Sequence, residues 1–417
     1  MKHPMTINRE RLWHRIIELG SIGQDAESGG VTRFSFTSIE RRAKDQVTEY
    51  MQQAGLIVRE DSVGNLIGRY EGLDEHAPAV VTGSHIDTVA QGGMFDGALG
   101  VLAAIEVLQS MHERDQRFKH PIEVIAFSDE EGSRFGFGMI GSRAFAGTLK
   151  QADLIYYDEQ HITIAEAMRS AGYSPEHIDQ AARASSDIKC YVELHIEQGK
   201  VLESLNQPVG IVTGIAGPLW QQFTLTGQAG HAGATPMLMR RDPMHAATAV
   251  LDFIYNEVRQ FKHGVATVGK FRVLPGGINI IPNEVQFTLD LRDIDEADRN
   301  ELEQRITEHA QRVCTELNID CNIELLQRVA PAPSSPHLIG VIDTAAQQLG
   351  MKEIPRLVSG AGHDGMQFQA LCPIAMLFVR SKDGISHNPK EWSSIEDCEA
   401  GADLLYYTLK QLASESY

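Results

Sequence analysis

Cysteine is scarce in this sequence and shows no recognisable pairing. The 417 residues include only five cysteines, an odd number, and no two of them form a CxxC pair. Small disulfide-stapled domains carry many more cysteines, in even numbers. We therefore exclude a disulfide framework and expect reduced thiols and a cytoplasmic location.

Long apolar runs and basic clusters are missing as well. No stretch approaches the roughly 18 consecutive apolar residues of a membrane-spanning helix, and residues 1–17 contain no apolar signal region. Lys and Arg total 37 against 56 Asp and Glu, which gives a formal net charge of −19. A chain this acidic, without a basic patch, is expected to bind neither nucleic acid nor an anionic membrane.

What the sequence does have is a distinctive stretch at residues 80–100, VVTGSHIDTVAQGGMFDGALG. It opens as a short apolar run typical of a buried strand. His85 and Asp87 follow, and a glycine-rich loop then leads to Asp96 and to a helical pattern over residues 98–111. Ligands of open α/β sheets bind at the carboxyl ends of strands. This stretch is therefore the first candidate for a functional site.

The order of the expected elements predicts two domains. Strand, helix and strand at residues 80–83, 98–111 and 121–127 form the unit that builds a parallel sheet in an α/β protein. Residues 212–328 instead follow a β-α-β-β-α-β order, which is a ferredoxin-like layout. We predict a discontinuous larger domain, residues 1–211 and 329–417, with residues 212–328 inserted. The expected inserted elements are strands 220–226, 266–273, 284–292 and 322–326 and helices 243–261 and 297–317.

Polar side chains gather where the expected strands of the larger domain end. Imidazoles and carboxylates together suit zinc, manganese, cobalt or nickel. Several candidate ligands with one shareable carboxylate indicate two metals about 3.5–4 Å apart. A solvated acidic loop is the plainer alternative for residues 128–135. The candidates are His85, Asp96, Glu130, Glu131, His195 and His387.

One of the two glutamates, and Asp87 next to His85, favour supporting roles. Consecutive Glu130 and Glu131 cannot both point the same way from an extended segment, so one can bind metal while the other serves as a general base toward water. Asp87 is better placed to orient His85 by a hydrogen bond to the second ring nitrogen.

Five motifs together resemble the M20 metallopeptidase superfamily, and more closely its hydantoinase/carbamoylase branch of amidohydrolases. They are GSHID, GGMFDG, DEEGSRF, ELHIEQG and SHNPKEW, and the similarity extends over nearly the whole chain. The resemblance implies a zinc-peptidase-like catalytic domain with a mixed central sheet and an inserted ferredoxin-like α+β domain that serves as lid and dimerisation surface. It also implies two divalent ions per subunit. The implied ligands are His85, Asp96 as the bridge, Glu131, His195 and His387, with Glu130 as the base.

The resemblance also implies substrate groups. Arg292 offers a planar fork for a carboxylate, and Asn279 and Gln198 can hydrogen bond a ureido group or the carboxylate. His231 can donate to the oxyanion of a tetrahedral intermediate. Gly360 lies in the glycine-rich loop SGAGHDG, whose backbone amides are further candidates for holding the carboxylate.

The implied activity is hydrolysis of the carbamoyl C–N bond of N-carbamoyl-L-amino acids by a homodimer. Allantoate and β-ureidopropionate carry the same ureido and carboxylate groups, so both remain alternatives. A non-catalytic ligand-binding protein of this fold is a third, which the presence of Glu130 disfavours. A nicotinamide enzyme is a fourth, because GFGMIG at residues 136–141 formally matches GxGxxG; it does not follow directly on a strand, however, as a dinucleotide motif requires.

Overall fold

The structure is a computed structural model that describes residues 6–351 and 353–415. Residues 1–5, part of the stretch expected to lack a signal region, lie outside the described residues. The chain divides into two compact units. The larger contains the residues up to Thr213, Ser334–Ser359 and the residues from His363 onward, and the smaller contains Gly214–Pro333 and Gly360–Gly362. No helix within the described residues is long and apolar enough to cross a membrane.

A mixed sheet forms the centre of the larger unit. Its strands run in the order β1-β2-β4-β3-β5-β16-β6-β14, with β15 paired to β6. Neighbours β4, β3, β5 and β16 are parallel, whereas β1, β2 and β6 pair antiparallel. The strands are β1 (Ile57–Glu60), β2 (Leu66–Tyr70), β3 (Ala79–His85), β4 (Ile122–Phe127), β5 (Ile188–Ile196), β6 (Val209–Ile215), β14 (Ala332–Pro333), β15 (Arg356–Ser359) and β16 (Ile374–Val379).

Helix α3 (Ala98–His112) covers part of this sheet and is itself buried. Every residue from Ala98 to Met111 is buried, as expected for a helix that is apolar on most of its surface. It packs on β3 and β5 and is covered by α1 and α10. Gly100 permits this close approach, because a Cβ there would lie 2.2 Å from the carbonyl oxygen of Leu194. The helices of this unit are α1 (Arg9–Gly20), α2 (Ser38–Gln53), α3, α4 (Ile140–Phe145), α5 (Ile164–Ser170), α6 (Val201–Ser204), α9 (Pro336–Gln348) and α10 (Ile395–Ser414).

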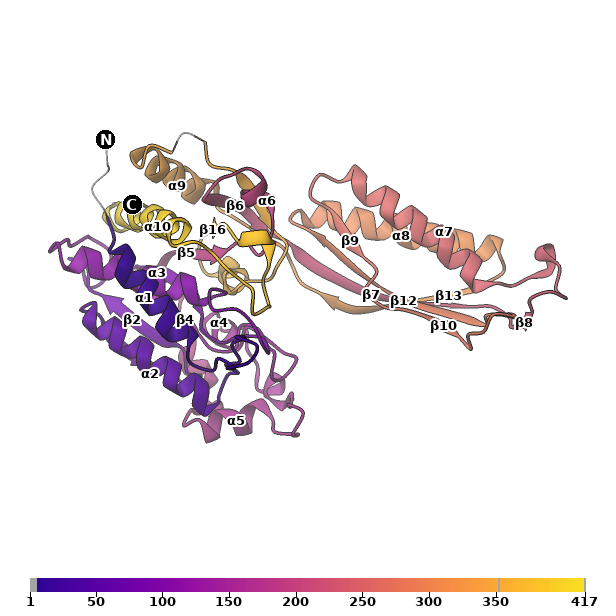
Figure 1. Cartoon of the computed structure of the whole chain (residues 1–417), viewed down its shortest axis with the longest axis horizontal. Coiled ribbons are helices and arrows are strands. Elements are labelled where there is room, and N and C mark those ends of the chain that lie inside the picture. The colour runs from indigo at the N-terminus through magenta and orange to yellow at the C-terminus, as the bar shows by residue number, and fades with distance from the viewer. Residues whose placement is uncertain (1–5, 352, 416–417) are drawn as a thin grey trace. The chain divides into compact units, whose positions relative to one another are not determined.

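The smaller unit is an antiparallel sheet with two helices on one face. The strands run in the order β10-β12-β7-β13, β9 pairs with β12, and β8 and β11 form a separate two-stranded ribbon. Figure 1 shows α7 and α8 side by side along this sheet. The elements are β7 (Gly217–Thr226), β8 (Gly230–His231), α7 (Pro243–Glu257), β9 (Val265–Thr267), β10 (Phe271–Leu274), β11 (Ile280–Ile281), β12 (Glu284–Asp293), α8 (Glu296–Glu316) and β13 (Asp320–Arg328).

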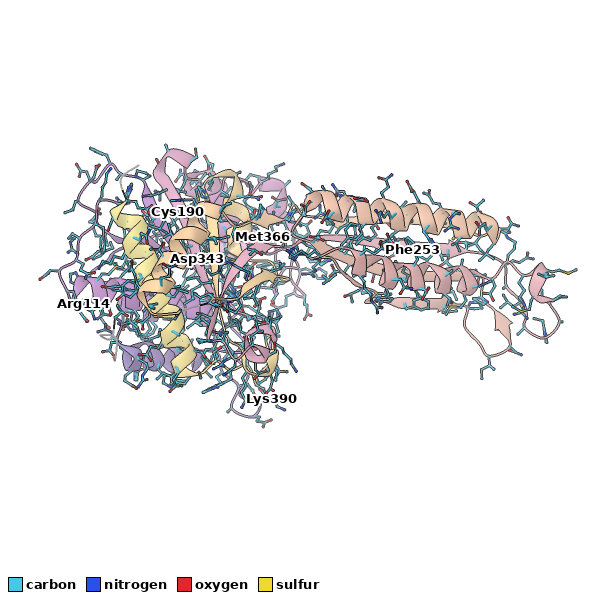
Figure 2. All side chains as sticks on the ribbon, turned by 90° about the horizontal axis from the view of Figure 1, so that it is seen from above. Arg114, Cys190, Phe253, Asp343, Met366 and Lys390 are labelled. Atoms are coloured by element: carbon cyan, nitrogen blue, oxygen red, sulfur yellow. The ribbon has the colours of Figure 1, made fainter. Side chains whose placement is uncertain are left out.

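Buried and partly exposed residues alternate along strands β7 and β12 of the smaller unit, and this explains how one face of its sheet packs against the helices. Along β12 every second residue is buried, so one face of the strand meets the helices. Phe223 and Phe287 stack in the resulting core with ring centroids 4.7 Å apart. Phe253, labelled on α7 in Figure 2, stacks on His309 of α8 at 3.9 Å. The mixed α/β class predicted from the sequence is confirmed. The main elements of the smaller unit are consistent with the predicted β-α-β-β-α-β order, to which the structure adds the short strands β8 and β11.

One predicted strand differs from the structure. The stretch 266–273 is expected as a single strand but forms β9 and β10. Thr267 pairs with Asp290, and Phe271 pairs with Phe287. The chain therefore advances by four residues from Thr267 to Phe271 while β12 advances by only three. The extra residue makes a bulge around Gly269, which interrupts the ladder.

Candidate active site

Parallel strands bring the expected ligands of the larger unit to one edge of the sheet. His85 is the last residue of β3 and lies opposite Phe127, the last residue of the parallel strand β4. His195 lies near the end of β5, opposite Phe378 of β16. The loops after β3, β4 and β16 carry Asp96, Glu130 with Glu131, and His387. Because these strand ends lie at one edge of the sheet, side chains that are far apart in sequence come close together.

Asp96 lies between the histidines. Its Oδ1 atom is 3.1 Å from Nε2 of His195 and 3.8 Å from Nε2 of His85. Its Oδ2 atom is 3.2 Å from Nε2 of His387, and that nitrogen is 3.6 Å from Oε1 of Glu131. Each carboxylate oxygen of Asp96 therefore faces a different set of donors.

These distances define two donor groups that share Asp96. One group is His85, Asp96 and His195, and the other is Asp96, Glu131 and His387; within each, the potential ligand atoms lie within 4.8 Å of one another. Imidazole nitrogens mixed with carboxylate oxygens suit borderline divalent ions such as zinc. A carboxylate with one oxygen in each group suits a bridging position. The residues present therefore fit a pair of divalent cations.

His85 is oriented by its own loop. Its Nδ1 atom donates to the backbone carbonyl of Asp87 at 3.1 Å, which leaves Nε2 directed at Asp96. The Asp87 carboxylate, expected to make that bond, lies 3.6 Å from Nδ1. It accepts instead from the backbone N–H groups of Glu130 and Glu131, each at 3.2 Å. Asp87 thus positions the loop that carries the two glutamates.

The side chains of Glu130 and Glu131, each 9% exposed, lie among other carboxylates. Burial raises the pKa of Glu130 well above its ordinary value, and the carboxylates of Asp364 and Glu131 raise it further. Burial likewise raises the pKa of Glu131 to about 8, with Asp96 adding to the effect. Glu130 Oε2 is 3.6 Å from Nε2 of His85. Positive charge at this place would relieve the repulsion, which is a second reason why cations fit.

The pKa values of the three histidines are shifted in different directions. Burial tends to lower the pKa of His195, but its hydrogen bond and charge interaction with Asp96 outweigh burial and raise the pKa to about 9. The hydrogen bond with Asp96 also raises the pKa of the half-exposed His387 to about 9. His85 is dominated by burial, which lowers its pKa to about 4.

Gln198 lies beside the shared carboxylate. Its Nε2 atom donates to Oδ2 of Asp96 at 3.0 Å. Its buried Oε1 atom has no hydrogen-bond partner among the described residues. The side chain thus offers an unused acceptor next to the donor groups, as a residue that meets substrate requires.

In the smaller unit, His231 and Asn279 are brought together by the ribbon of β8 and β11. His231 pairs with Ile280, and the N–H of Ala232 donates to the carbonyl of Asn279 at 3.0 Å. The Nδ1 atom of His231 accepts from the N–H groups of Gly233 and Ala234, at 3.1 and 3.2 Å. A neutral imidazole that accepts at Nδ1 carries its proton at Nε2. The exposed side chain therefore presents a hydrogen-bond donor.

Arg292 is already partly engaged. Its Nε and Nη2 atoms bond the carboxylate of Asp290, at 3.0 and 2.8 Å to the nearer oxygens, and Nη1 donates to the carbonyl of Gly360. Both residues of the ion pair are about one quarter exposed. The guanidinium is thus held in one orientation, with part of its fork open to a ligand.

The glycine-rich stretch 136–141 is used internally. The backbone N–H groups of Met139, Ile140 and Gly141 donate to the carbonyls of Glu130, Asp129 and Ser128, at 3.0, 3.2 and 2.7 Å. These three amides hold the glutamate loop, so they are not available to a pyrophosphate.

Two residues of the SHNPKEW motif contact the centre without having been singled out. Ser386 donates its hydroxyl toward Oδ2 of Asp96, and Glu391 accepts from the backbone of the Asp96 loop. Both residues belong to the same short motif as His387, and this proximity in the sequence could have identified them as neighbours of the centre.

Comparisons with known proteins identify the family of the chain. The profile of Peptidase family M20/M25/M40 matches residues 81–411. The chain is 53% identical to an N-carbamoyl-L-amino acid amidohydrolase of Geobacillus stearothermophilus (98% of this chain, 99% of the relative) and 42% identical to one of Pseudomonas sp. strain NS671 (97% and 98%). A crystal structure of an amidase of the hydantoinase/carbamoylase family from Burkholderia multivorans has 34% identity and a TM-score of 0.92, with 99% of this chain and 100% of that chain covered. The chain therefore belongs to Peptidase family M20/M25/M40, within its hydantoinase/carbamoylase branch.

Proposed function

We propose that the protein hydrolyses the carbamoyl C–N bond of N-carbamoyl-L-amino acids, giving the L-amino acid, carbon dioxide and ammonia. The observation that carries the proposal is Asp96, whose two oxygens face two separate groups of metal donors. The N-carbamoyl-L-amino acid amidohydrolases that share up to 53% of this sequence support the choice of substrate. The five cysteines are free thiols, which supports a cytoplasmic location.

In this proposal His85, Asp96 and His195 hold one divalent ion, and Asp96, Glu131 and His387 hold the other. The ions, when bound, supply Lewis acidity that polarises the carbamoyl carbonyl and acidifies water. Zinc, manganese, cobalt and nickel all match the donors. Asp87 keeps Glu131 in place through the backbone bond described above.

Glu130 acts as the general base. It is buried beside His85 but belongs to neither donor group, so its carboxylate is free to accept a proton from the attacking water. The same carboxyl group then delivers that proton to the leaving nitrogen. This transfer balances the first cleavage, since water supplies a hydroxyl group to carbon and a proton to nitrogen. The carbamic acid formed at the same time loses carbon dioxide, which frees the second nitrogen, so that the L-amino acid and ammonia are both released. A protein that only bound its ligand would have no use for such a base.

The substrate is recognised at its two polar ends. Arg292 and Asn279 bind the carboxylate, with the loop at Gly360 beside Arg292. Gln198 accepts from a ureido N–H through its unused Oε1. His231 donates from Nε2 to the oxyanion that develops on the carbamoyl oxygen.

The smaller unit also supports pairing with a second copy of the chain. Strand β13 lies at the end of its sheet, and Leu325 and Leu326 on it are half exposed. An uncovered edge strand with apolar side chains is a ready surface for association. Light scattering during size exclusion should therefore give the mass of a dimer, near twice the 46.0 kDa of one chain.

A substrate panel tests the proposed reaction. Ammonia release from N-carbamoyl-L-amino acids should exceed release from the D-enantiomers, allantoate and β-ureidopropionate under the same metal conditions. Preference for allantoate or β-ureidopropionate would keep the ureido chemistry but replace the substrate. Binding without any turnover of the panel would contradict hydrolysis.

A further inference from the structure

One buried carboxylate connects the two loops that carry Asp96 and His387. The side chain of Glu391 is only 3% exposed. Its Oε1 atom accepts hydrogen bonds from the backbone N–H groups of Phe95 and Asp96, at 2.9 and 3.0 Å. Glu391 therefore fixes the backbone from which the Asp96 side chain extends.

The second oxygen of Glu391 reaches the Asp96 side chain through Ser386. The Ser386 hydroxyl oxygen lies 2.9 Å from Oε2 of Glu391 and 3.0 Å from Oδ2 of Asp96. Ser386 is also the residue immediately before His387. A hydroxyl has one proton, so Ser386 donates to one of the two carboxylates and contacts the other. This contact links the carboxylate of Asp96 to the backbone next to His387.

The surroundings show that space is made for this contact. A Cβ atom on Gly93 would lie 2.1 Å from Oε1 of Glu391, so only glycine fits there. Trp392 packs against Phe95 with ring centroids 5.5 Å apart, which joins the same two loops by an apolar contact. Lys390, labelled in Figure 2, is exposed, whereas the next residue turns inward.

We propose that Glu391 is a positioning residue that holds Asp96 so that its two oxygens face the two donor groups at once. The inference rests on the proposed metal-dependent function. Glu391 belongs to neither donor group and acts through Asp96 and Ser386. A bridging carboxylate must satisfy two sets of distances together, so a small rotation of Asp96 would weaken both. Groups that orient metal ligands in this way typically contribute about 10-fold to 100-fold to metal affinity.

Direct cobalt binding tests the inference without any substrate. The metal-free wild-type protein and its Glu391→Ala variant are titrated with Co²⁺ and followed by calorimetry and visible absorption. We expect Glu391→Ala to bind Co²⁺ about 10-fold to 100-fold more weakly and to change the absorption bands that report coordination geometry. Since the measurement involves no turnover, it stands even if the proposed substrate is wrong.

Glu391→Gln distinguishes positioning from charge. The amide oxygen of glutamine can accept the bonds from Phe95 and Asp96, and its NH₂ group can donate to Ser386. We therefore expect Glu391→Gln to keep Co²⁺ affinity within a few-fold of wild type. A loss as large as that of Glu391→Ala would show that the negative charge matters instead and would overturn the proposal.

Two further variants serve as controls. Glu123 of β4 is buried to a similar degree and pairs with Arg69 and Arg183 instead of the two loops, so Glu123→Ala should affect thermal stability but not Co²⁺ affinity. Ser386→Ala breaks only the side-chain connection and should weaken Co²⁺ in the same direction as Glu391→Ala, which also covers the case in which that variant does not fold. Wild-type Co²⁺ affinity and absorption in Glu391→Ala or Ser386→Ala, or an equal loss of affinity in Glu123→Ala, would overturn the proposal.

Discussion

Arg292 and Asp290, two residues apart on the same face of β12, form an ion pair in which Nη2 of the arginine lies 2.8 Å from Oδ2 of the aspartate. Residues i and i+2 of a strand share a face, so the pair is built into the sheet. The pair fixes the plane of the guanidinium before any ligand arrives. A planar group held in advance loses less freedom on binding a carboxylate.

Arg292→Lys tests this recognition. Lysine keeps the charge but cannot pair with Asp290 and a substrate carboxylate in one plane. We expect KM for N-carbamoyl-L-amino acids to rise about 10-fold to 100-fold, the range of one lost charge-assisted hydrogen bond. The corresponding amides lack the anion and should be affected little. Equal weakening of both substrate types would make Arg292 a structural residue.

Glu130→Gln tests the general base. The variant should retain both metals, because Glu130 belongs to neither donor group. Loss of proton transfer should lower kcat by about 10²–10⁴. Elemental analysis and steady-state kinetics are compared on the same preparation. Turnover at the wild-type rate in the fully metallated variant would remove Glu130 from this role.

A mixed dimer tests whether His231 serves the neighbouring subunit. Glu130→Gln damages the centre of the subunit that carries it. If His231 acts across the dimer, His231→Ala damages the centre of the partner subunit. Loss of one oxyanion donor costs about 10²–10³ in rate. Co-expression with two tags allows the mixed dimer to be purified. His231 lies in the inserted domain that is proposed to pair with a second chain, so we expect it to serve the partner's site and the mixed dimer to show close to half of wild-type activity from one restored site. Activity no higher than that of either parent variant would place His231 in its own subunit's site.

Metal-free protein should become less stable as the pH rises from 7 to 9. The folded-state pKa of Glu131 is raised to about 8 and those of His195 and His387 to about 9, so the folded state holds protons that the unfolded chain has released. Stability therefore falls as the pH passes through these values. The lowered pKa of His85 acts below pH 6.5 and lies outside this window.

Thermal unfolding at several pH values measures the effect. Glu131→Gln removes one titrating group and should reduce the decline in Tm, and metal-loaded protein should show less of it because cations replace the protons. A metal-free protein whose Tm stays level or rises between pH 7 and 9 would contradict the expected charge crowding.

The sequence predicts the donor residues as candidates because each lies at or just beyond the end of an expected strand, and parallel neighbours bring such ends to one edge of the sheet. The sequence does not predict the residues and hydrogen bonds that hold these donors in position. Glu391 meets the Asp96 loop only through tertiary packing, and His85 bonds the carbonyl of Asp87 because the local turn places it nearer than the carboxylate. The bulge that divides the 266–273 stretch likewise depends on pairing with β12 rather than on propensity.

Under the proposed function, hydrolysis requires two divalent ions bound around Asp96. The direct measurement is ammonia release from an N-carbamoyl-L-amino acid by chelator-treated protein as metal is returned in known amounts. Activity should be absent without metal, and full activity should require two equivalents per subunit. Undiminished activity in protein shown by elemental analysis to be metal-free, or saturation at one equivalent, would contradict the claim.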